Sequence, residues 1–159
     1  MSAWYRVISP LAHAWTRFFV WAYPLGLGLL LGHAYLLLET KGRRTGLTRV
    51  TPLGYVGWAT DFLVQPLHGP DSDWLRNLQA SSEVRVWVGR RSLTCLGRVI
   101  DDQRERQLAF RVLAASKSVS GWTARRHFSL AGHSDELSLY LASQDMGKQI
   151  VLLELESPE

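Results

Sequence analysis

The chain has 159 residues, 47% of them hydrophobic and 20% charged, which is ordinary for a globular protein and enough to bury one core. A net charge of only +4 argues against a general nucleic-acid-binding role. The single cysteine, Cys95, excludes an intramolecular disulfide and a thiolate metal cluster. The five histidines show no ligand spacing and no nucleophile–base pair is recognisable, so we expect neither a metal site nor a hydrolase.

The N-terminal part of the sequence leaves three interpretations open. Residues 18–38 carry no formal charge, a length that could span a bilayer, although Pro24 and several glycines interrupt the run. Aromatic side chains with Arg6 and Arg17, and no acidic residue, also suit a membrane interface. Packing of a helix against the rest of the protein is the third interpretation. We expect an N-terminal helical segment over 1–33, with a helix at 10–22.

A basic stretch follows between two predicted strands. The apolar run 34–38 enters it, and the β-branched and aromatic run 50–56 leaves it. Four cations fall within nine residues and no carboxylate lies among them, while Gly42 and Gly46 allow a tight turn. Such a turn suits a phosphate or carboxylate ligand, and a solvated basic hairpin is the alternative. The cations are Lys41, Arg43, Arg44 and Arg49.

The rest of the chain predicts a small β-rich domain. Alternation and turn residues predict strands at 61–65, 83–88, 92–100 and 149–155. Helices are expected at 73–80, capped by Asp71 or Ser72, and after Asp101 or Asp102 to about 115. Antiparallel strands with short links and few helices favour a barrel.

Two sequence blocks resemble the deazaflavin-dependent nitroreductase and quinone reductase family. The blocks are Gly42-Arg43-x-Thr45-Gly46-x-x-Arg49-x-x-Pro52-Leu53 and Trp74-x-x-Asn77-Leu78-x-Ala80. The resemblance covers roughly residues 34–115. It implies an α+β, mainly β fold: a split antiparallel β-barrel over 34–159, FMN-binding-like, with the N-terminal helix and one or two packing helices.

The resemblance also implies an enzyme. The expected function is hydride transfer from the deazaflavin coenzyme F420 to a small lipophilic acceptor, a quinone or a nitro compound. An FMN- or haem-binding barrel, and a non-catalytic membrane-associated cofactor-binding protein, remain alternatives. The expected location is cytoplasmic, with peripheral contact at the inner membrane face left open. A homodimer is expected because such barrels often share an edge.

The candidate cofactor site combines the basic turn with positions taken from the resemblance. Lys41, Arg43, Arg44 and Arg49 would hold the phosphate and acidic tail, with Thr45 and Gly46 in the turn. Pro52 and Leu53 would line the ring. The family's serine after the third strand is absent, so Gln65 or His68 would replace it. Trp74 and Asn77 are site candidates, although a core aromatic and a structural amide are equally compatible. No catalytic residue is identified.

Overall fold

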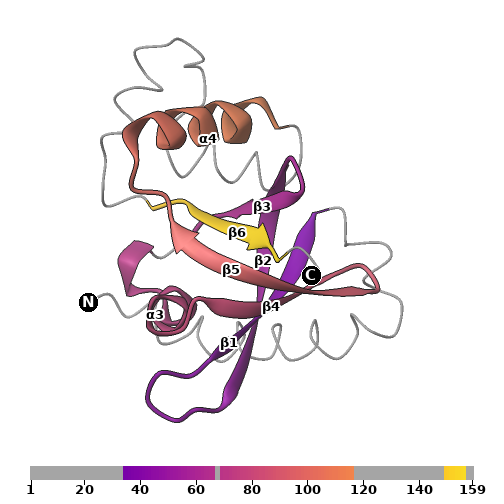
Figure 1. The fold of residues 1–159 in the computed structure, drawn as a ribbon, viewed down its shortest axis with the longest axis vertical. Helices are drawn as coiled ribbons and strands as arrows, with labels where there is room; N and C mark the ends of the chain where they lie inside the picture. Colours follow the sequence, from indigo (N-terminus) through magenta and orange to yellow (C-terminus); the bar gives the residue numbers. More distant parts are fainter. Residues whose placement is uncertain (1–33, 67–68, 117–148, 157–159) are drawn as a thin grey trace, which may run out of the picture.

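The computed structural model describes residues 34–66, 69–116 and 149–156, and in them six antiparallel strands close a barrel (Figure 1). The order around the barrel is β1-β2-β3-β6-β5-β4. This confirms the mainly β, antiparallel barrel. The strands are β1 (Tyr35–Lys41), β2 (Thr48–Trp58), β3 (Asp61–Val64), β4 (Glu83–Val88), β5 (Arg91–Val99) and β6 (Val151–Leu155).

In the described residues, two helices and one short 3-10 turn accompany the strands. They are η2 (Gly69–Asp71), α3 (Asp73–Ala80) and α4 (Gln103–Ala115). The expected N-terminal helix lies outside the described residues. Residues 35–38 belong to β1, so one uninterrupted membrane helix over 18–38 is excluded. None of the helices in the described ranges has the length and apolar character needed to cross a membrane.

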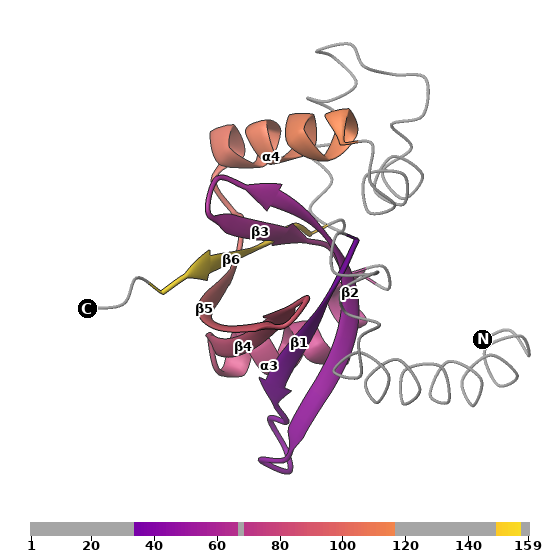
Figure 2. The ribbon, with the colours of Figure 1, turned by 90° about the vertical axis from the view of Figure 1, so that its right-hand side faces the viewer.

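The C-terminal strand completes the barrel. β6 lies between β3 and β5, with Leu153 opposite Phe62 on one side and Gly97 on the other. Strands separated by most of the sequence therefore lie side by side (Figure 2). Closure on the other side comes from β1 and β4, where Leu38 is opposite Val86.

The barrel interior is filled by alternate strand residues and by one face of α3. Leu36, Leu38 and Val86 are fully buried there, and α3 adds Leu75 and Leu78. The helix packs closely because β5 has a glycine beneath it: a Cβ on Gly97 would lie 2.4 Å from Leu78 Cδ1. The interior thus fixes where α3 can lie.

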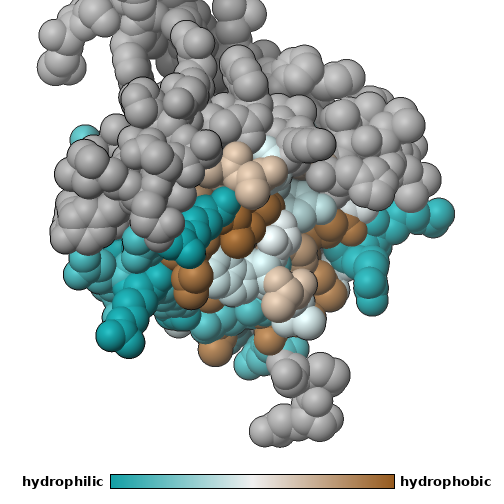
Figure 3. Space-filling model, turned by 90° about the horizontal axis from the view of Figure 1, so that it is seen from above, coloured by the Kyte–Doolittle hydropathy of each residue, from teal (hydrophilic) through white to brown (hydrophobic). Residues whose placement is uncertain are grey.

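The second helix, α4, covers the outer face of β3 and β6. Phe110 and Leu113 pack with Leu63 and Leu152 in a separate buried cluster. Asp102 begins the helix, as predicted, by accepting a hydrogen bond from the Glu105 N–H at 2.9 Å. From above, Figure 3 shows hydrophobic surface between two hydrophilic flanks.

An ion-pair cluster joins α4 to the strands beneath it. Arg98 of β5 donates to Glu105 at 2.6 Å and to Glu154 of β6 at 3.0 Å. The hydrogen bond to Glu105 is the main reason that the pKa of Arg98 is raised further above its usual range. These bonds fix α4 on the side of the barrel away from the basic turn (Figure 1).

Candidate cofactor site

The basic stretch forms the hairpin at the end of a two-stranded arm made by β1 and β2, which extends beyond the barrel (Figure 2). Backbone bonds from Gly42 N to Leu47 O at 2.9 Å and from Gly46 N to Gly42 O at 2.7 Å close the turn. Gly46 has φ +67, a conformation that favours glycine. Thr45 Oγ1 accepts from Leu47 N at 3.4 Å. The strand–turn–strand prediction is therefore confirmed.

Arg43 connects this hairpin to α3. Its backbone N–H and its Nη1 both donate to Asn77 Oδ1, at 3.2 and 3.1 Å, and its guanidinium also binds Asp73 at 3.1 Å. The amide of Asn77, which is only 5% exposed, donates in turn to Thr40 at 3.4 Å. Asn77 therefore makes the hydrogen bonds expected of a structural amide, one of its two interpretations. The charge of Arg43 is already paired with Asp73.

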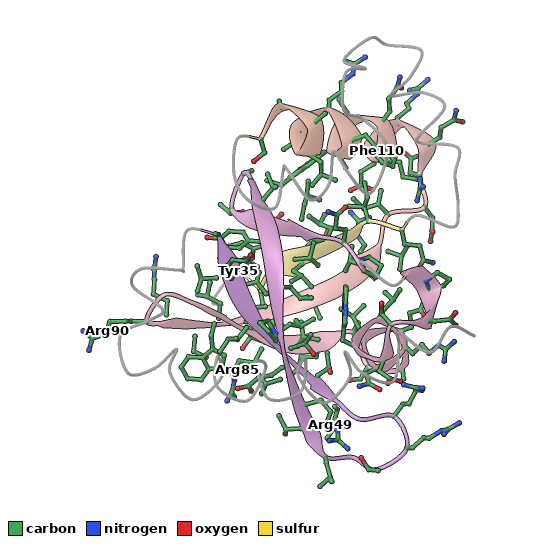
Figure 4. The ribbon with its side chains drawn as sticks, turned by 180° about the vertical axis from the view of Figure 1, so that it is seen from behind. Tyr35, Arg49, Arg85, Arg90 and Phe110 are labelled. Atoms are coloured by element: carbon green, nitrogen blue, oxygen red, sulfur yellow. The ribbon has the colours of Figure 1, made fainter. Side chains whose placement is uncertain are left out.

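The other three cations are exposed and differ from Arg43. Among the residues that the structure describes, the side chains of Lys41, Arg44 and Arg49 make no hydrogen bond or ion pair. Arg49 is opposite Thr40, whose side chain is buried, so Arg49 lies on the inner face of the arm. Lys41 is opposite Thr48, one position further along and on the outer face. Figure 4 shows Arg49 on the arm.

The residues expected to line a ring lie on different faces of β2. Leu53 packs against the barrel interior, as does Trp74, which is 8% exposed. Pro52 is opposite Leu37 on the outer face. Trp87 donates its indole N–H to Glu39 Oε1 at 2.7 Å on that same face. The outer cluster there consists of Tyr35, Leu37, Val50 and Trp87.

Gln65 follows β3 and is buried, with 7% of its surface exposed, and its Oε1 accepts no hydrogen bond from the residues that the structure describes. Within those residues two further buried oxygens lack a partner: Ser72 Oγ, also 7% exposed as a residue, and Gln149 Oε1. His68 lies outside the described residues. The sequence singled out Gln65 but neither of the other two as a site residue, because no local pattern shows that a side-chain oxygen will lack a donor.

The chemistry of the described residues does not supply a nucleophile or a metal site. Burial of Cys95, together with the negative charges of Asp61 and Glu156, raises the pKa of its thiol to about 11. Within the described ranges there is no group of three metal-ligating side chains. What the described residues offer is a cationic arm and three buried side-chain oxygens that lack a hydrogen-bond donor among these residues.

A family model described as F420H(2)-dependent quinone reductase matches residues 15–127. The chain belongs to this family. It is therefore an oxidoreductase of an F420-dependent family. A comparison with curated proteins found no match.

Two solved structures with a TM-score of 0.52 show the same fold at low identity, and a third aligns with a TM-score of 0.49. The conserved hypothetical protein Rv2991 of Mycobacterium tuberculosis aligns with 83% of this chain and 79% of its own, at 15% identity and TM-score 0.52. A Clostridium acetobutylicum protein related to general stress protein 26, of the pyridoxinephosphate oxidase family, aligns over 84% of both chains at 8% identity and TM-score 0.52. An F420-H2 dependent reductase, FDR-A, aligns with 76% of this chain and 94% of its own, at 17% identity and TM-score 0.49.

The donor set on the arm fits the anionic part of F420. The cofactor carries a phosphate and an acidic glutamate tail, which require cations and backbone donors. Lys41, Arg44 and Arg49 are exposed and have no partner in the described part of the chain, and no carboxylate lies between them in the sequence. Arg43 keeps fewer donors for a ligand because Asp73 and Asn77 occupy part of its guanidinium.

Proposed function

We propose that this protein uses F420H2 to reduce a quinone or another small lipophilic acceptor. F420H2 gives a hydride to the quinone and releases a proton to solvent, and the reduced quinone takes up a proton from solvent, giving oxidised F420 and a hydroquinone. The observation that carries the proposal is the arm of β1 and β2, where Lys41, Arg44 and Arg49 are unpaired within the described residues.

In this proposal Lys41, Arg44 and Arg49 bind the anionic groups of the cofactor, whereas Arg43 positions the hairpin that carries them. Arg44 and Arg49 donate charge-assisted hydrogen bonds to the phosphate and the carboxylates of the tail, and Lys41 adds a third positive charge. Arg43 holds the hairpin on α3 through Asp73 and Asn77, which fixes the end of the arm that carries Arg49 on its inner face and Lys41 on its outer face. The arm thus supplies affinity, while the hydride chemistry belongs to the cofactor.

We also propose a peripheral location at the cytoplasmic face of the membrane, because lipophilic quinones partition into the membrane. The proposed contact uses the N-terminal segment 1–33, whose sequence combines aromatic side chains with Arg6 and Arg17 and no acidic residue. Co-sedimentation of the protein with anionic liposomes tests this contact, and a protein that stays in the supernatant contradicts it.

The proposed reaction is tested by mixing the purified protein with F420H2 under anoxic conditions and following the absorbance of oxidised F420. We expect the wild-type protein to catalyse fast oxidation of F420H2 when menadione is added. Arg49→Ala should catalyse this oxidation slowly at the same cofactor concentration. A nitroaromatic acceptor in a parallel reaction decides between the two acceptor classes. A protein that binds FMN or haem and leaves F420H2 unchanged would contradict the proposal.

A further inference from the structure

Arg85, Arg90 and Arg91, on β4, β5 and the turn between them, form a second group of cations apart from the arm. Within the described ranges their side chains make neither a hydrogen bond nor an ion pair. Other exposed arginines are bound to a carboxylate, as Arg76 is to Asp71. The proposed binding of the cofactor leaves this second group without a role.

Arg90 and Arg91 lie at the free end of the β4–β5 hairpin. Val88 is the last residue of β4 and is opposite Arg91, so Gly89 and Arg90 make the turn between the two strands. Both arginines are exposed, and Figure 4 shows Arg90 projecting from this end, away from Arg49 on the arm. The hairpin therefore presents two adjacent positive charges to solvent.

The N-terminal segment joins the barrel at this same end. Leu37 of β1 is opposite Trp87 of β4, so continuing the antiparallel register by two positions places Tyr35 beside Gly89. Because Tyr35 is the first residue of β1, the segment 1–33 meets the barrel next to the turn of the hairpin. The arm begins at the other end of β1, whose seven residues span about 20 Å.

The cations of the hairpin do not converge on one point. Arg85 lies on the same face of β4 as Trp87, which is the outer face. Arg91 is opposite Val88 and therefore lies on the other face. A site for a small anion needs donors that point to one place. Cations that point in different directions from a protruding turn suit a broad anionic surface instead.

We propose that the end of the β4–β5 hairpin, with Arg90 and Arg91, binds the anionic headgroups of a lipid bilayer beside the N-terminal segment. The inference rests on the proposed peripheral location and assigns a folded part of the barrel to that contact. Residues 1–33 supply aromatic side chains, and the hairpin supplies a second, electrostatic attraction. Stable peripheral attachment generally needs two such contributions.

This contact also sets how the protein is oriented on the membrane. With the hairpin end against the headgroups, the arm lies about 20 Å away along β1, beyond the screening length of about 8–10 Å. Lys41, Arg44 and Arg49 then remain in the aqueous phase, where an anionic cofactor is dissolved. The two groups of cations therefore serve different ligands.

Removal of charge from the hairpin tests the contact. The full-length protein is sedimented with phosphatidylcholine vesicles, with and without phosphatidylglycerol. Arg90→Ala/Arg91→Ala should bind the vesicles with phosphatidylglycerol about ten- to thirtyfold more weakly than wild type, because each cation near an anionic surface contributes about fivefold. High salt should remove this difference, and the affinity for F420 should be unchanged.

Two further variants are the controls. Arg104, on α4, is also exposed and has no partner among the described residues. It follows the far end of β5, whose nine residues place it about 25 Å from the turn, so Arg104→Ala should change vesicle binding by less than about twofold. Arg90→Lys/Arg91→Lys should bind like wild type, because attraction to a charged surface depends on charge and not on the guanidinium fork.

The outcomes separate this inference from the proposed reaction. Equal vesicle binding by wild type and Arg90→Ala/Arg91→Ala, or an equal loss in Arg104→Ala, would overturn the inference. A loss in the lysine variant would assign the hairpin to a ligand that needs guanidinium groups, and weaker F420 binding by the alanine variant would assign it to the cofactor; either result overturns the inference. Wild type that ignores anionic vesicles overturns both the inference and the peripheral location, but leaves the F420 reaction standing. A protein that binds vesicles through the hairpin and fails to oxidise F420H2 contradicts only the reaction.

Discussion

At the scale of single residues, the structure separates cations that the sequence presents as equivalent. Arg43 and Arg49 lie six positions apart in one basic stretch. Arg43 is bound to α3 by Asp73 and Asn77, partners 30 and 34 residues further along the chain. A local pattern predicts that cations gather in a turn, but it cannot show that one of them is paired by a distant helix.

This difference gives opposite predictions for two alanine variants. Arg49→Ala should weaken F420 binding by about ten- to a hundredfold, because a charge-assisted hydrogen bond contributes about 1.5–3 kcal/mol, and it should leave unfolding unchanged. Arg43→Ala should lower the free energy of unfolding by about 1–3 kcal/mol, since it removes bonds to the buried Asn77. Urea unfolding and F420 titration of both variants measure this. Equal stability losses would refute the assignment.

Cys95 should be unreactive in the folded protein. Its thiol pKa is raised from 9.0 to about 11 by burial and by Asp61 and Glu156, so little thiolate exists near neutral pH. A thiol reagent at pH 8 should label the native protein at least about a hundredfold more slowly than the urea-unfolded chain. Because folding keeps the thiol protonated, this group's contribution to stability is complete below pH 9 and disappears as the pH rises to about 11. Rapid labelling of native protein would contradict this.

At the scale of elements, local patterns predicted some boundaries better than others. The helix at 73–80 and the strand at 83–88 have the predicted bounds. β2 was predicted over 50–56 and extends over Thr48–Trp58, because its ends are held by pairing with β1 and β3. Such pairing is a long-range interaction, which a local pattern does not show. Residues 48 and 49 are also polar, so the hydrophobic run that predicted the strand does not include them.

Docking of α3 depends on the absence of a side chain at Gly97. Gly97→Ala places a methyl group 2.4 Å from Leu78 Cδ1, so the variant should lose about 1–3 kcal/mol of stability. Leu78→Ala should lose about 2–5 kcal/mol by leaving a cavity. In the double variant the new methyl partly fills that cavity, so urea unfolding should show a loss smaller than the sum of the two. Additive losses would mean that residues 97 and 78 are not in steric contact.

At the scale of the whole molecule, the barrel is closed by its last strand. The sequence predicted a final strand near 149–155 but not its place, since strand order depends on which partners meet across most of the chain. β6 pairs with β3 and β5 at once, and Leu153 in it is fully buried.

A chain that ends at residue 148 should therefore fail to fold. Without β6, both β3 and β5 present an unpaired edge beside an exposed core, a combination that favours aggregation. We expect this truncated chain to be insoluble, or to lack a cooperative thermal transition followed by circular dichroism. A chain that ends at Glu156 keeps every described contact, including the bond from Glu156 N to Thr94 O at 3.1 Å, and should unfold like the full-length protein. If the chain ending at 148 unfolds cooperatively with the wild-type midpoint, β6 is not required for closure, because a barrel of five strands would then be stable by itself.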